Sequence, residues 1–505
     1  MLRIGLAPEV SGIDDVGYLE AAQRVSDGRS LDNLYPLFQF RVGMAYPFGW
    51  ALGHSLLRPD QFWILTTAAD AISLCALFVA GTLLIGRRAG LLAAFLYGQY
   101  PLAVQNATLY MPNAMQVAAV SAAVALVAIA RRQRSPWHSG MLSLLSGVVI
   151  GLGYLVKEDV AIIVPVIAIA ALSTSMLRRS LVIGVCAGAA VVFALECLAY
   201  WYFTGEPFRR LSVALPATTG LQIEEIWSMG AYLRTLWLLP VQVGLFWWWA
   251  IPAAWVALRS EDRRVRFLGI ALVIVFCYLQ FGSGSIRQYM PLPKTPRYTA
   301  IATPFLILVL ASFLSGLFNT RNTQAWIAIA VLTVASVPCI FLMSIEASER
   351  MRNTLAAIPV LREARPPRLY TDYYSARLLT LLLPRGTDVI AWYHADFNAR
   401  VMQVRANPEL DAGAYVLFDR QASKIYTSSY EMPLPAAIEH LPTRWRRVWL
   451  HHAYGEDSVP RHVLGAIGAA AETLPRVPLA SRISRNVHDM LDGDEAALYE
   501  VPSAQ

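Results

Sequence analysis

Charged residues are scarce in this sequence. Only 15% of its 505 residues are Asp, Glu, Lys or Arg, whereas 56% are hydrophobic and the mean hydropathy is +0.45. This composition excludes an ordinary soluble protein and indicates a polytopic membrane protein. The net charge of +7 does not call for a nucleic-acid partner, because basic loop residues in membrane proteins are explained first by orientation relative to the cytoplasm.

Signatures of several other protein classes are also absent. The five cysteines all lie inside apolar segments, so the sequence offers neither a disulfide framework nor a cysteine-based metal site. No glycine-rich phosphate fingerprint follows a predicted strand, and residues 1–8 lack an apolar core long enough for a cleavable signal peptide. No metal-ligand spacing joins His54, His394, His440, His451 and His452.

Apolar blocks dominate the chain from Phe62 onward. Each block has roughly 16 to 25 residues and is able to cross a bilayer as a helix. We therefore predict an all-α polytopic membrane domain over residues 62–344 with about ten spans. The blocks are 62–85, 89–108, 113–130, 139–156, 159–177, 180–203, 231–258, 266–281, 298–318 and 325–344.

The connections between these blocks alternate in character. Arginines cluster in every second connection, which the positive-inside rule assigns to the cytoplasm. The basic positions are Arg87, Arg88, Arg131, Arg132, Arg134, Arg178, Arg179, Arg259, Arg263, Arg264, Arg266 and Arg321. The long connections then share the extracytoplasmic face, where active sites are favoured. They are residues 1–61, 204–230, 282–296 and the chain after Ser344.

The two ends of the chain differ from the membrane domain. In residues 1–61, prolines interrupt short apolar pieces, which predicts a first extracytoplasmic loop with interfacial helices. In residues 345–505, strand-like and helix-like pieces alternate, which predicts a soluble extracytoplasmic α/β domain. The predicted strands are 368–372, 388–393, 414–420, 446–450 and 497–501.

Two adjacent carboxylates, Asp14 and Asp15, head a short amphipathic helix. Adjacent helical residues point about 100° apart, so one carboxylate could accept a proton while the other holds a ligand or a cap. The alternative is that either residue merely caps the helix. Tyr18, Ala22 and Val25 fall at helical spacing and would lay the helix on the membrane face, as they would in a purely structural interfacial helix.

Further ionisable residues lie near the predicted outer face. Arg41 precedes a turn and is well shaped for phosphate oxygens, although a lone interfacial arginine also suits a lipid headgroup. Lys157, Glu158 and Asp159 occupy a tight outer turn, where they indicate either a functional site or an interfacial ion pair. Three weaker candidates could simply hydrogen-bond between helices: Asn106, Asn113 and Glu196.

A basic cluster occupies residues 282–298, on a face where the positive-inside rule disfavours it. Arg287, Lys294, Arg297 and Tyr298 crowd this loop, which suggests an anionic ligand such as the phosphate of a lipid carrier. The 204–230 loop also carries charges, including Arg209 and Arg210, and we interpret it as a flexible cover of low specificity.

Five motifs resemble those of the GT-C membrane glycosyltransferases. They are most similar to the glycosyltransferase 39 type, which includes dolichyl-phosphate-mannose protein mannosyltransferases and bacterial aminoarabinose lipid A transferases. The motifs follow the family's order along the chain. They are Asp14-Asp15-x-x-Tyr18-x-x-x-Ala22 with Gly28, Arg41-x-Gly43-x-x-x-Pro47, Gly86–Ala94, Gly151–Glu158 and Pro296-Arg297-Tyr298.

The resemblance implies a GT-C fold and a sugar donor linked to polyprenyl phosphate. It implies transfer with inversion to a lipid, polysaccharide or protein acceptor on the non-cytoplasmic face. Asp14 matches the family's catalytic aspartate, and Arg297 resembles a contact to the donor phosphate.

The sequence departs from the family at three places. A membrane span normally precedes the acidic motif, but here only Met1–Ile13 do, so an upstream helix is either missing from this sequence or lost. Asp15 stands where many relatives carry Glu. Arg41-Val-Gly43 replaces the paired prolines of several subfamilies, which leaves the acceptor open.

The residues and the resemblance together predict a hexosyl- or pentosyltransferase of the cell envelope. Asp14, with Asp15 beside it, would supply the catalytic carboxylates, and a divalent cation held by carboxylates is compatible with this chemistry. Four residues would bind the donor phosphate: Arg41, Lys294, Arg297 and Tyr298. Five would line the substrate cavity: Tyr18, Asn113, Lys157, Glu158 and Arg287.

The expected location is the bacterial inner membrane, with the bilayer and the lipid-linked donor as partners. A non-catalytic alternative is a lipid-carrier transporter or a glycan-binding scaffold, although the paired, broken half-repeats typical of transporters are not visible. A ligase that moves a whole lipid-linked oligosaccharide is a second enzymatic alternative.

Overall fold

The structure, a computed structural model, describes most of the 505 residues. The described residues are 13–32, 34–213, 243–283, 292, 296–349, 351–384, 386–396, 401–420, 432, 434–435, 438, 440–455, 458–473, 484, 487–488, 491 and 494–502. They form two compact units. The first contains Ala21–Met343, and the second contains the first turns of helix α2 as far as Glu20 together with the chain from Ser344 onward.

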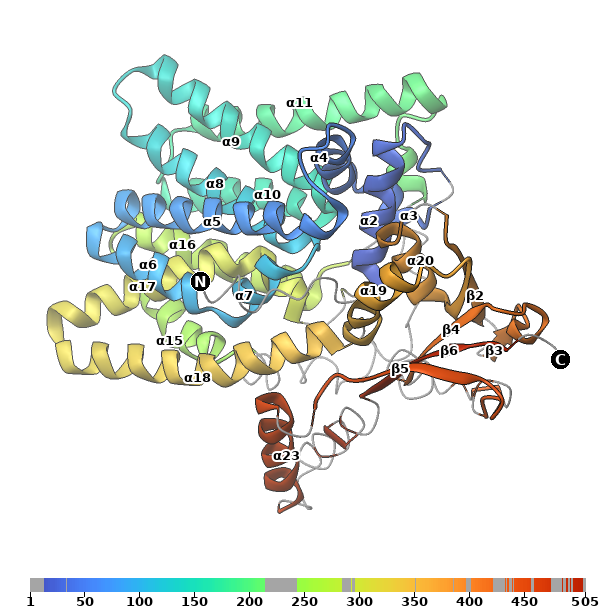
Figure 1. The fold of residues 1–505 in the computed structure, drawn as a ribbon. Helices are drawn as coiled ribbons and strands as arrows, with labels where there is room; N and C mark the ends of the chain where they lie inside the picture. Colours follow the sequence, from blue (N-terminus) through green and yellow to red (C-terminus); the bar gives the residue numbers. More distant parts are fainter. Residues whose placement is uncertain are drawn as a thin grey trace. The chain divides into compact units, whose positions relative to one another are not determined.

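The first unit is built from helices (Figure 1). Its first part consists of the last turns of α2 (Ile13–Ser26), then α3 (Pro36–Phe40), α4 (Val42–Gly53) and the short η1 (Pro59–Gln61). The remaining elements follow in the order α5 (Trp63–Leu84), α6 (Arg87–Gln99), α7 (Pro101–Thr108), α8 (Pro112–Arg132), α9 (Pro136–Val156), η2 (Glu158–Ile162), α10 (Ile163–Thr174), α11 (Arg179–Thr204), α15 (Phe246–Arg259), α16 (Arg263–Phe281), η3 (Pro296–Ala302), α17 (Thr303–Thr320) and α18 (Asn322–Glu349), of which the part as far as Met343 belongs to this unit.

Seven of the described helices are long and apolar enough to cross a membrane. They are Trp63–Leu84, Pro112–Arg132, Pro136–Val156, Arg179–Thr204, Arg263–Phe281, Pro296–Thr320 and Asn322–Phe341. The predicted polytopic helical domain is therefore confirmed, but the count of about ten spans is not. The predicted span 89–108 breaks where Pro101, which has no backbone N–H, begins a new helix. The predicted span 159–177 is divided between η2 and α10.

Burial separates central helices from peripheral ones. The apolar stretch of α8 is 72% buried, and that of the Pro296–Thr320 span is 67% buried. In α11 only 28% of the apolar stretch is buried. Figure 1 shows α11 along one edge of the bundle. Its large exposed side chains, among them Trp201, Tyr202 and Phe203, suit contact with lipid and with the membrane interface.

Small residues allow α9 and α11 to pack closely. A Cβ atom at Gly147 of α9 would collide with the Val185 carbonyl oxygen of α11, and one at Gly188 of α11 would collide with the Leu144 carbonyl oxygen. Membrane helices use such small residues to bring their backbones together. This contact sets the spacing between α9 and α11.

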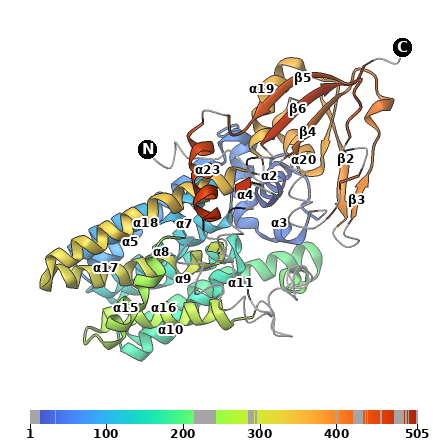
Figure 2. The same ribbon diagram turned by 90° about the horizontal axis from the view of Figure 1, so that it is seen from below.

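The second unit contains a six-stranded sheet, which confirms the predicted α/β composition of the C-terminal part (Figure 2). The strand order is β3-β2-β1-β4-β6-β5; β1 is parallel to β2 and β4, and the remaining pairs are antiparallel. Its elements are α19 (Arg352–Ala364), β1 (Arg368–Asp372), α20 (Tyr373–Leu382), β2 (Asp388–Asp396), β3 (Val401–Val404), η4 (Pro408–Leu410), β4 (Tyr415–Asp419), β5 (Arg446–His452), α23 (Val459–Glu472) and β6 (Glu495–Glu500). The sequence predicted five of these strands and missed β3.

Buried carboxylates fix the ends of two neighbouring strands. Asp372, at the end of β1, accepts hydrogen bonds from the backbone amides of Tyr374 and Ser375 and so caps α20. Asp419, at the end of β4, accepts hydrogen bonds from Asn353 and Thr354 in the first turn of α19. These bonds attach both helices to the sheet.

Replacing Asp372 by Ala should loosen the first turn of α20. Loss of such a cap costs about 0.5–2 kcal/mol, which corresponds to about 2- to 30-fold faster local opening. Hydrogen exchange measured by mass spectrometry on the full chain should show this acceleration in residues 373–382. Asp388→Ala, which removes an exposed carboxylate, is the control and should leave α20 unchanged. Equal exchange in the two variants would refute the role of the cap.

Candidate active site

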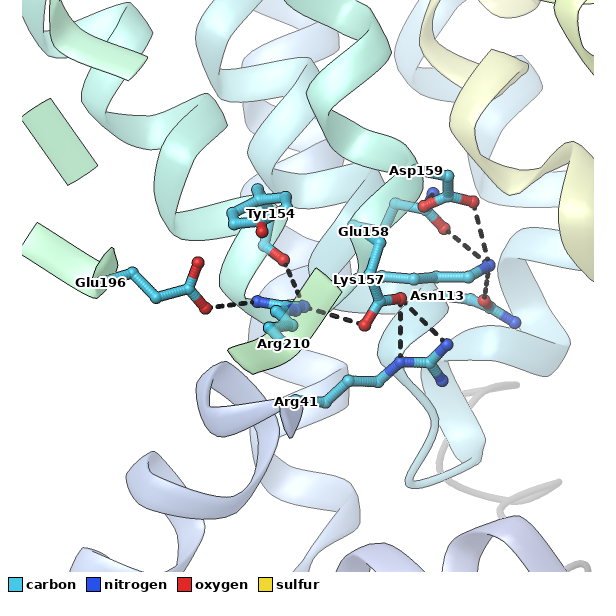
Figure 3. A network of polar contacts seen from close by, with 9 residues as sticks. Arg41, Asn113, Tyr154, Lys157, Glu158, Asp159, Glu196 and Arg210 are labelled. Carbon is cyan, nitrogen blue, oxygen red and sulfur yellow. Dashed lines mark hydrogen bonds and ion pairs between the residues drawn. The ribbon is translucent and has the colours of Figure 1, made fainter. Parts of the chain in front are cut away.

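Three consecutive ionisable residues follow the end of α9. The backbone leaves the helix at Lys157, which is extended (φ −156°, ψ 130°), and re-enters a 3-10 turn at Glu158. The break sends the Lys157 side chain and its neighbours toward different partners (Figure 3). The sequence Lys-Glu-Asp at a helix end therefore builds two polar clusters side by side.

The first cluster surrounds the ammonium group of Lys157, a residue that is only 5% exposed. Its Nζ atom lies 3.2 Å from Asn113 Oδ1, 3.5 Å from Gln116 Oε1 and 3.3 Å from Asp159 Oδ2. Gln116 in turn donates a 2.7 Å hydrogen bond to Asp159 Oδ1, which orients that carboxylate. A buried lysine needs such acceptors, because an uncompensated charge would be costly in a site of low polarity.

Two residues of the late Pro-Arg-Tyr motif extend this cluster. The Tyr298 ring at the start of the Pro296–Thr320 span lies 4.7 Å from Lys157 Nζ, within the range of a cation–π interaction. The guanidinium carbon of Arg297, whose side chain is exposed, lies 5.6 Å from the same ring. Two cations from distant parts of the chain thus share one aromatic ring.

The second cluster is organised by the Glu158 carboxylate. Oε2 accepts hydrogen bonds from Nε and Nη2 of Arg41 at 3.3 and 3.2 Å, and Oε1 accepts one from Nη2 of Arg210 at 2.9 Å. Figure 3 shows Glu158 between the two guanidinium groups. Each carboxylate oxygen therefore has a different arginine as its partner.

Arg210 joins three elements of the bundle. Its side chain is 2% exposed, and its guanidinium also donates to Glu196 Oε1 of α11 at 2.8 Å and to the Tyr154 carbonyl oxygen of α9 at 2.9 Å. The guanidinium also lies over the Tyr154 ring, 4.4 Å from its centre. The Tyr154 carbonyl is in the last turn of α9, where helix carbonyls lack intrahelical donors.

Close packing of α4 against α9 brings Arg41 to Glu158. Arg41 immediately precedes α4, and a Cβ atom at Gly43 would lie 2.8 Å from both Val156 Cγ2 and the Val156 amide nitrogen. Only glycine lets the start of α4 approach the end of α9 this closely. In the motif Arg41-x-Gly43, the glycine therefore provides the close contact that positions the arginine beside Glu158.

The two arginines control the ionisation of Glu158, which lies in the turn between two membrane helices. Burial alone would favour the neutral carboxyl, but the Arg41 and Arg210 guanidiniums outweigh it and lower the pKa of Glu158 from 4.5 to about 2. Glu158 is therefore a carboxylate throughout the physiological pH range.

The structure brings together six residues that the sequence predicted. Asn113, Lys157, Arg297 and Tyr298 belong to the first cluster, and Arg41 and Glu158 belong to the second. Arg287 and Lys294 lie outside the described residues.

The acidic motif belongs to the second unit. Asp14, half-buried, and Asp15, buried, lie in the first turn of α2, with Tyr18 buried one turn later. Glu20 on the same helix accepts a 3.0 Å hydrogen bond from Nε of Arg377 in α20. The predicted catalytic role of Asp14 and Asp15 remains a prediction.

Sequence reasoning underestimated Arg210, Glu196 and Gln116. The interpretation of Arg210 as part of a flexible cover is wrong, because its side chain is buried and bonded to three elements. The signal in the sequence was the isolated Glu196 in an apolar helix, since a carboxylate there requires a cation. Within the described residues, no group of His, Cys, Asp or Glu side chains is arranged to hold a metal ion.

Comparison with known proteins identifies the class to which this fold belongs. Residues 47–201, which include Lys157 and Glu158, match the family model described as dolichyl-phosphate-mannose-protein mannosyltransferase. No curated protein matches the chain.

Solved structures of low sequence identity share the fold. The apo crystal structure of ArnT from Cupriavidus metallidurans is 14% identical, with a TM-score of 0.56 over 85% of this chain and 92% of that one. ArnT bound to undecaprenyl phosphate is 13% identical, with a TM-score of 0.54 over 86% and 93% of the two chains. The Archaeoglobus fulgidus oligosaccharyltransferase in complex with Zn and sulfate is 13% identical, with a TM-score of 0.56 over 99% and 87%.

The chain therefore shares the GT-C fold of these structures, and the match over residues 47–201 agrees with the predicted resemblance to the glycosyltransferase 39 type. With its apolar helices, it is an integral multi-pass membrane protein.

Adding one methyl group at Gly43 should separate α4 from α9. Overpacking of this kind costs about 1–3 kcal/mol, so Gly43→Ala should unfold at a lower temperature than the wild type. Thermal unfolding of the purified chain in detergent, followed by tryptophan fluorescence, measures the shift. Gly98→Ala is the matched control, because no atom lies within 4 Å of its added Cβ. A Gly43→Ala variant as stable as the control would contradict the packing.

Replacing Glu158 by Gln should destabilise the protein in a pH-dependent way. The pKa of Glu158 is lower in the folded protein, so its ionised form stabilises the fold above about pH 4.5, and this contribution is lost as the pH falls toward 2. The difference in melting temperature between the wild type and Glu158→Gln should be constant between about pH 5.5 and 8 and should shrink below about pH 4.5.

The same series with Glu206→Gln, which alters an exposed carboxylate, is the control and should show no difference at any pH. A Glu158→Gln difference that persists undiminished near pH 3 would rule out an ionised Glu158 as its cause.

Proposed function

We propose that this protein is a glycosyltransferase that moves a sugar from a polyprenyl-phosphate carrier to an acceptor at the extracytoplasmic face of the membrane. The observation that carries the proposal is the convergence of Lys157 and Arg297 on the Tyr298 ring. These cations meet at the end of one membrane span and the start of another, where the phosphate of a lipid carrier would lie.

The geometry of Lys157 suits an anionic ligand. Its contacts to Asn113, Gln116 and Asp159 are 3.2–3.5 Å, longer than the about 2.7–2.9 Å of a strong charge-assisted hydrogen bond. The surrounding oxygens therefore hold the ammonium in place without using its full bonding strength. A phosphate oxygen would replace one of these three acceptors with a shorter bond, and Arg297 would offer the planar guanidinium that binds phosphate well.

The comparisons support the same donor class. The chain has the fold of ArnT, whose crystal structure has been determined with undecaprenyl phosphate bound, and residues 47–201 match a family named for a dolichyl-phosphate sugar donor. We extend to this chain a polyprenyl-phosphate-linked sugar as donor and a lipid, polysaccharide or protein group as acceptor.

The proposed mechanism is a single displacement. Asp14 accepts the proton of the acceptor nucleophile as the nucleophile forms a bond to the anomeric carbon of the sugar. The bond from that carbon to the carrier phosphate breaks on the opposite side, so the configuration inverts. Arg297, Lys294 and Arg41 would stabilise the charge that develops on the departing lipid phosphate. The carrier phosphate is already a good leaving group, so the reaction needs no nucleotide.

The proposal includes an orientation. The basic connections, among them Arg87–Arg88 and Arg131–Arg132, would face the cytoplasm of a bacterial inner membrane. The acidic motif, the Lys157 turn and the C-terminal α/β unit would then face the opposite side, where lipid-linked sugars meet their acceptors.

Replacing Asp14 by Asn should remove the general base. Such a base contributes about 10²–10⁴-fold to the rate, so transfer should fall by at least that order while expression and membrane insertion stay normal. The measurement is sugar transfer from a polyprenyl-phosphate donor by membranes that contain equal amounts of each variant.

Asp32→Asn, which alters an exposed carboxylate, should transfer at the wild-type rate. Normal turnover by Asp14→Asn would eliminate Asp14 as the base. Stoichiometric binding of the carrier by the wild type, with no release of sugar, would instead support a transporter or scaffold.

A further inference from the structure

Arg210 is placed to act on substrate binding without touching the substrate. Its side chain is 2% exposed, and its guanidinium is bonded to Glu158, Glu196 and the Tyr154 carbonyl. A group buried and bonded in this way cannot reach a lipid phosphate. Of its two carboxylate partners, Glu158 is the more accessible, because its side chain is 32% exposed and that of Glu196 is 7% exposed.

Glu158 connects Arg210 to Arg41. A carboxylate with only one arginine partner tends to pair with it through both oxygens, as a bidentate pair. Here Oε1 is taken by Arg210, so Arg41 bonds through Nε and Nη2 to Oε2 alone. Arg210 therefore fixes the rotation of the carboxylate and limits its hold on Arg41.

Glu196 completes the arrangement from α11. Its carboxylate is 7% exposed and lies 2.8 Å from Nη1 of Arg210, so it holds the guanidinium in a fixed plane. The four charges of Arg41, Glu158, Arg210 and Glu196 sum to zero, which makes their partial burial tolerable. Removing any one of these four side chains therefore changes both the net charge of the cluster and its geometry.

We infer that Arg210 is a positioning residue that sets the orientation of Arg41 toward the carrier phosphate by dividing the Glu158 carboxylate between two guanidiniums. The inference rests on the proposed function, because it gives Arg41 a phosphate to bind. It assigns no proton transfer or bond-breaking step to Arg210, so the effect falls on donor affinity and not on the chemical step.

The test compares the steady-state kinetics of the full-length variants with an undecaprenyl-phosphate-linked sugar. Arg210→Met should raise the KM for the donor about 10- to 100-fold, the range expected for lost hydrogen bonds to charged groups, and should change kcat by less than about threefold. Arg210→Lys keeps the positive charge but lacks the planar set of guanidinium donors, so it should fold normally and show an intermediate KM for the donor. Arg209→Met, which alters the half-exposed neighbour on the same turn, should leave both constants within about twofold of wild type.

Two double variants separate positioning from charge balance. In the Glu158→Gln background, Arg210→Met should have little further effect on KM, because the carboxylate that transmits its influence is gone. In Arg210→Met with Glu196→Gln, the buried charge is balanced again but KM should stay high. Full recovery of KM in that variant, or the same effect of Arg210→Met with and without Glu158, would overturn the inference.

Transfer by the wild type distinguishes failure of the positioning role of Arg210 from failure of the proposed glycosyltransferase function. Transfer by the wild type with an unchanged donor KM in Arg210→Lys and Arg210→Met would reject the positioning role and leave the proposed function standing. Absence of transfer by the wild type would reject the proposed function, and the inference with it.

Discussion

The Glu158 carboxylate holds two guanidiniums at the point where α9 ends. Arg41 and Arg210 would repel each other in a partly buried site, and a carboxylate that stays ionised to about pH 2 removes that penalty. Arg210 then ties α9 to α11 through Glu196. The adjacent residue, Lys157, is held separately by Asn113, Gln116 and Asp159, so one turn of chain supports two groups of cations.

The backbones of α4, α9 and α11 lie close enough together for these charged side chains to meet. Gly43 lets the start of α4 lie on the last turn of α9, and Gly147 and Gly188 let α9 and α11 approach each other. Arg41, Lys157 and Glu158 lie at the ends of these helices, where backbone groups still need hydrogen-bond partners. The close packing at these glycines therefore also brings the charged side chains within bonding distance of one another.

The sequence predicted the features that depend on local pattern. Apolar blocks revealed the helices, alternation revealed five of the six strands of the sheet, and Lys157-Glu158 was singled out because charges are rare at membrane depth. It did not predict the break at Pro101 as the end of one helix and the start of another, or the burial of Arg210. That burial depends on Glu196, Glu158 and Tyr154, which lie on different elements, and no local pattern encodes such a long-range meeting.

The central claim of the proposed function is that cations around Lys157 and Arg297 receive the phosphate of a lipid carrier, with Asp14 as the proposed general base. A cryo-electron microscopy structure of the full chain with undecaprenyl phosphate would test it most directly. The account predicts phosphate density within hydrogen-bonding distance of the Lys157 ammonium and the Arg297 guanidinium, with the Asp14 carboxylate facing the same cavity. Phosphate density at the other end of the helical bundle, or an Asp14 that faces away from the bound phosphate, would contradict it.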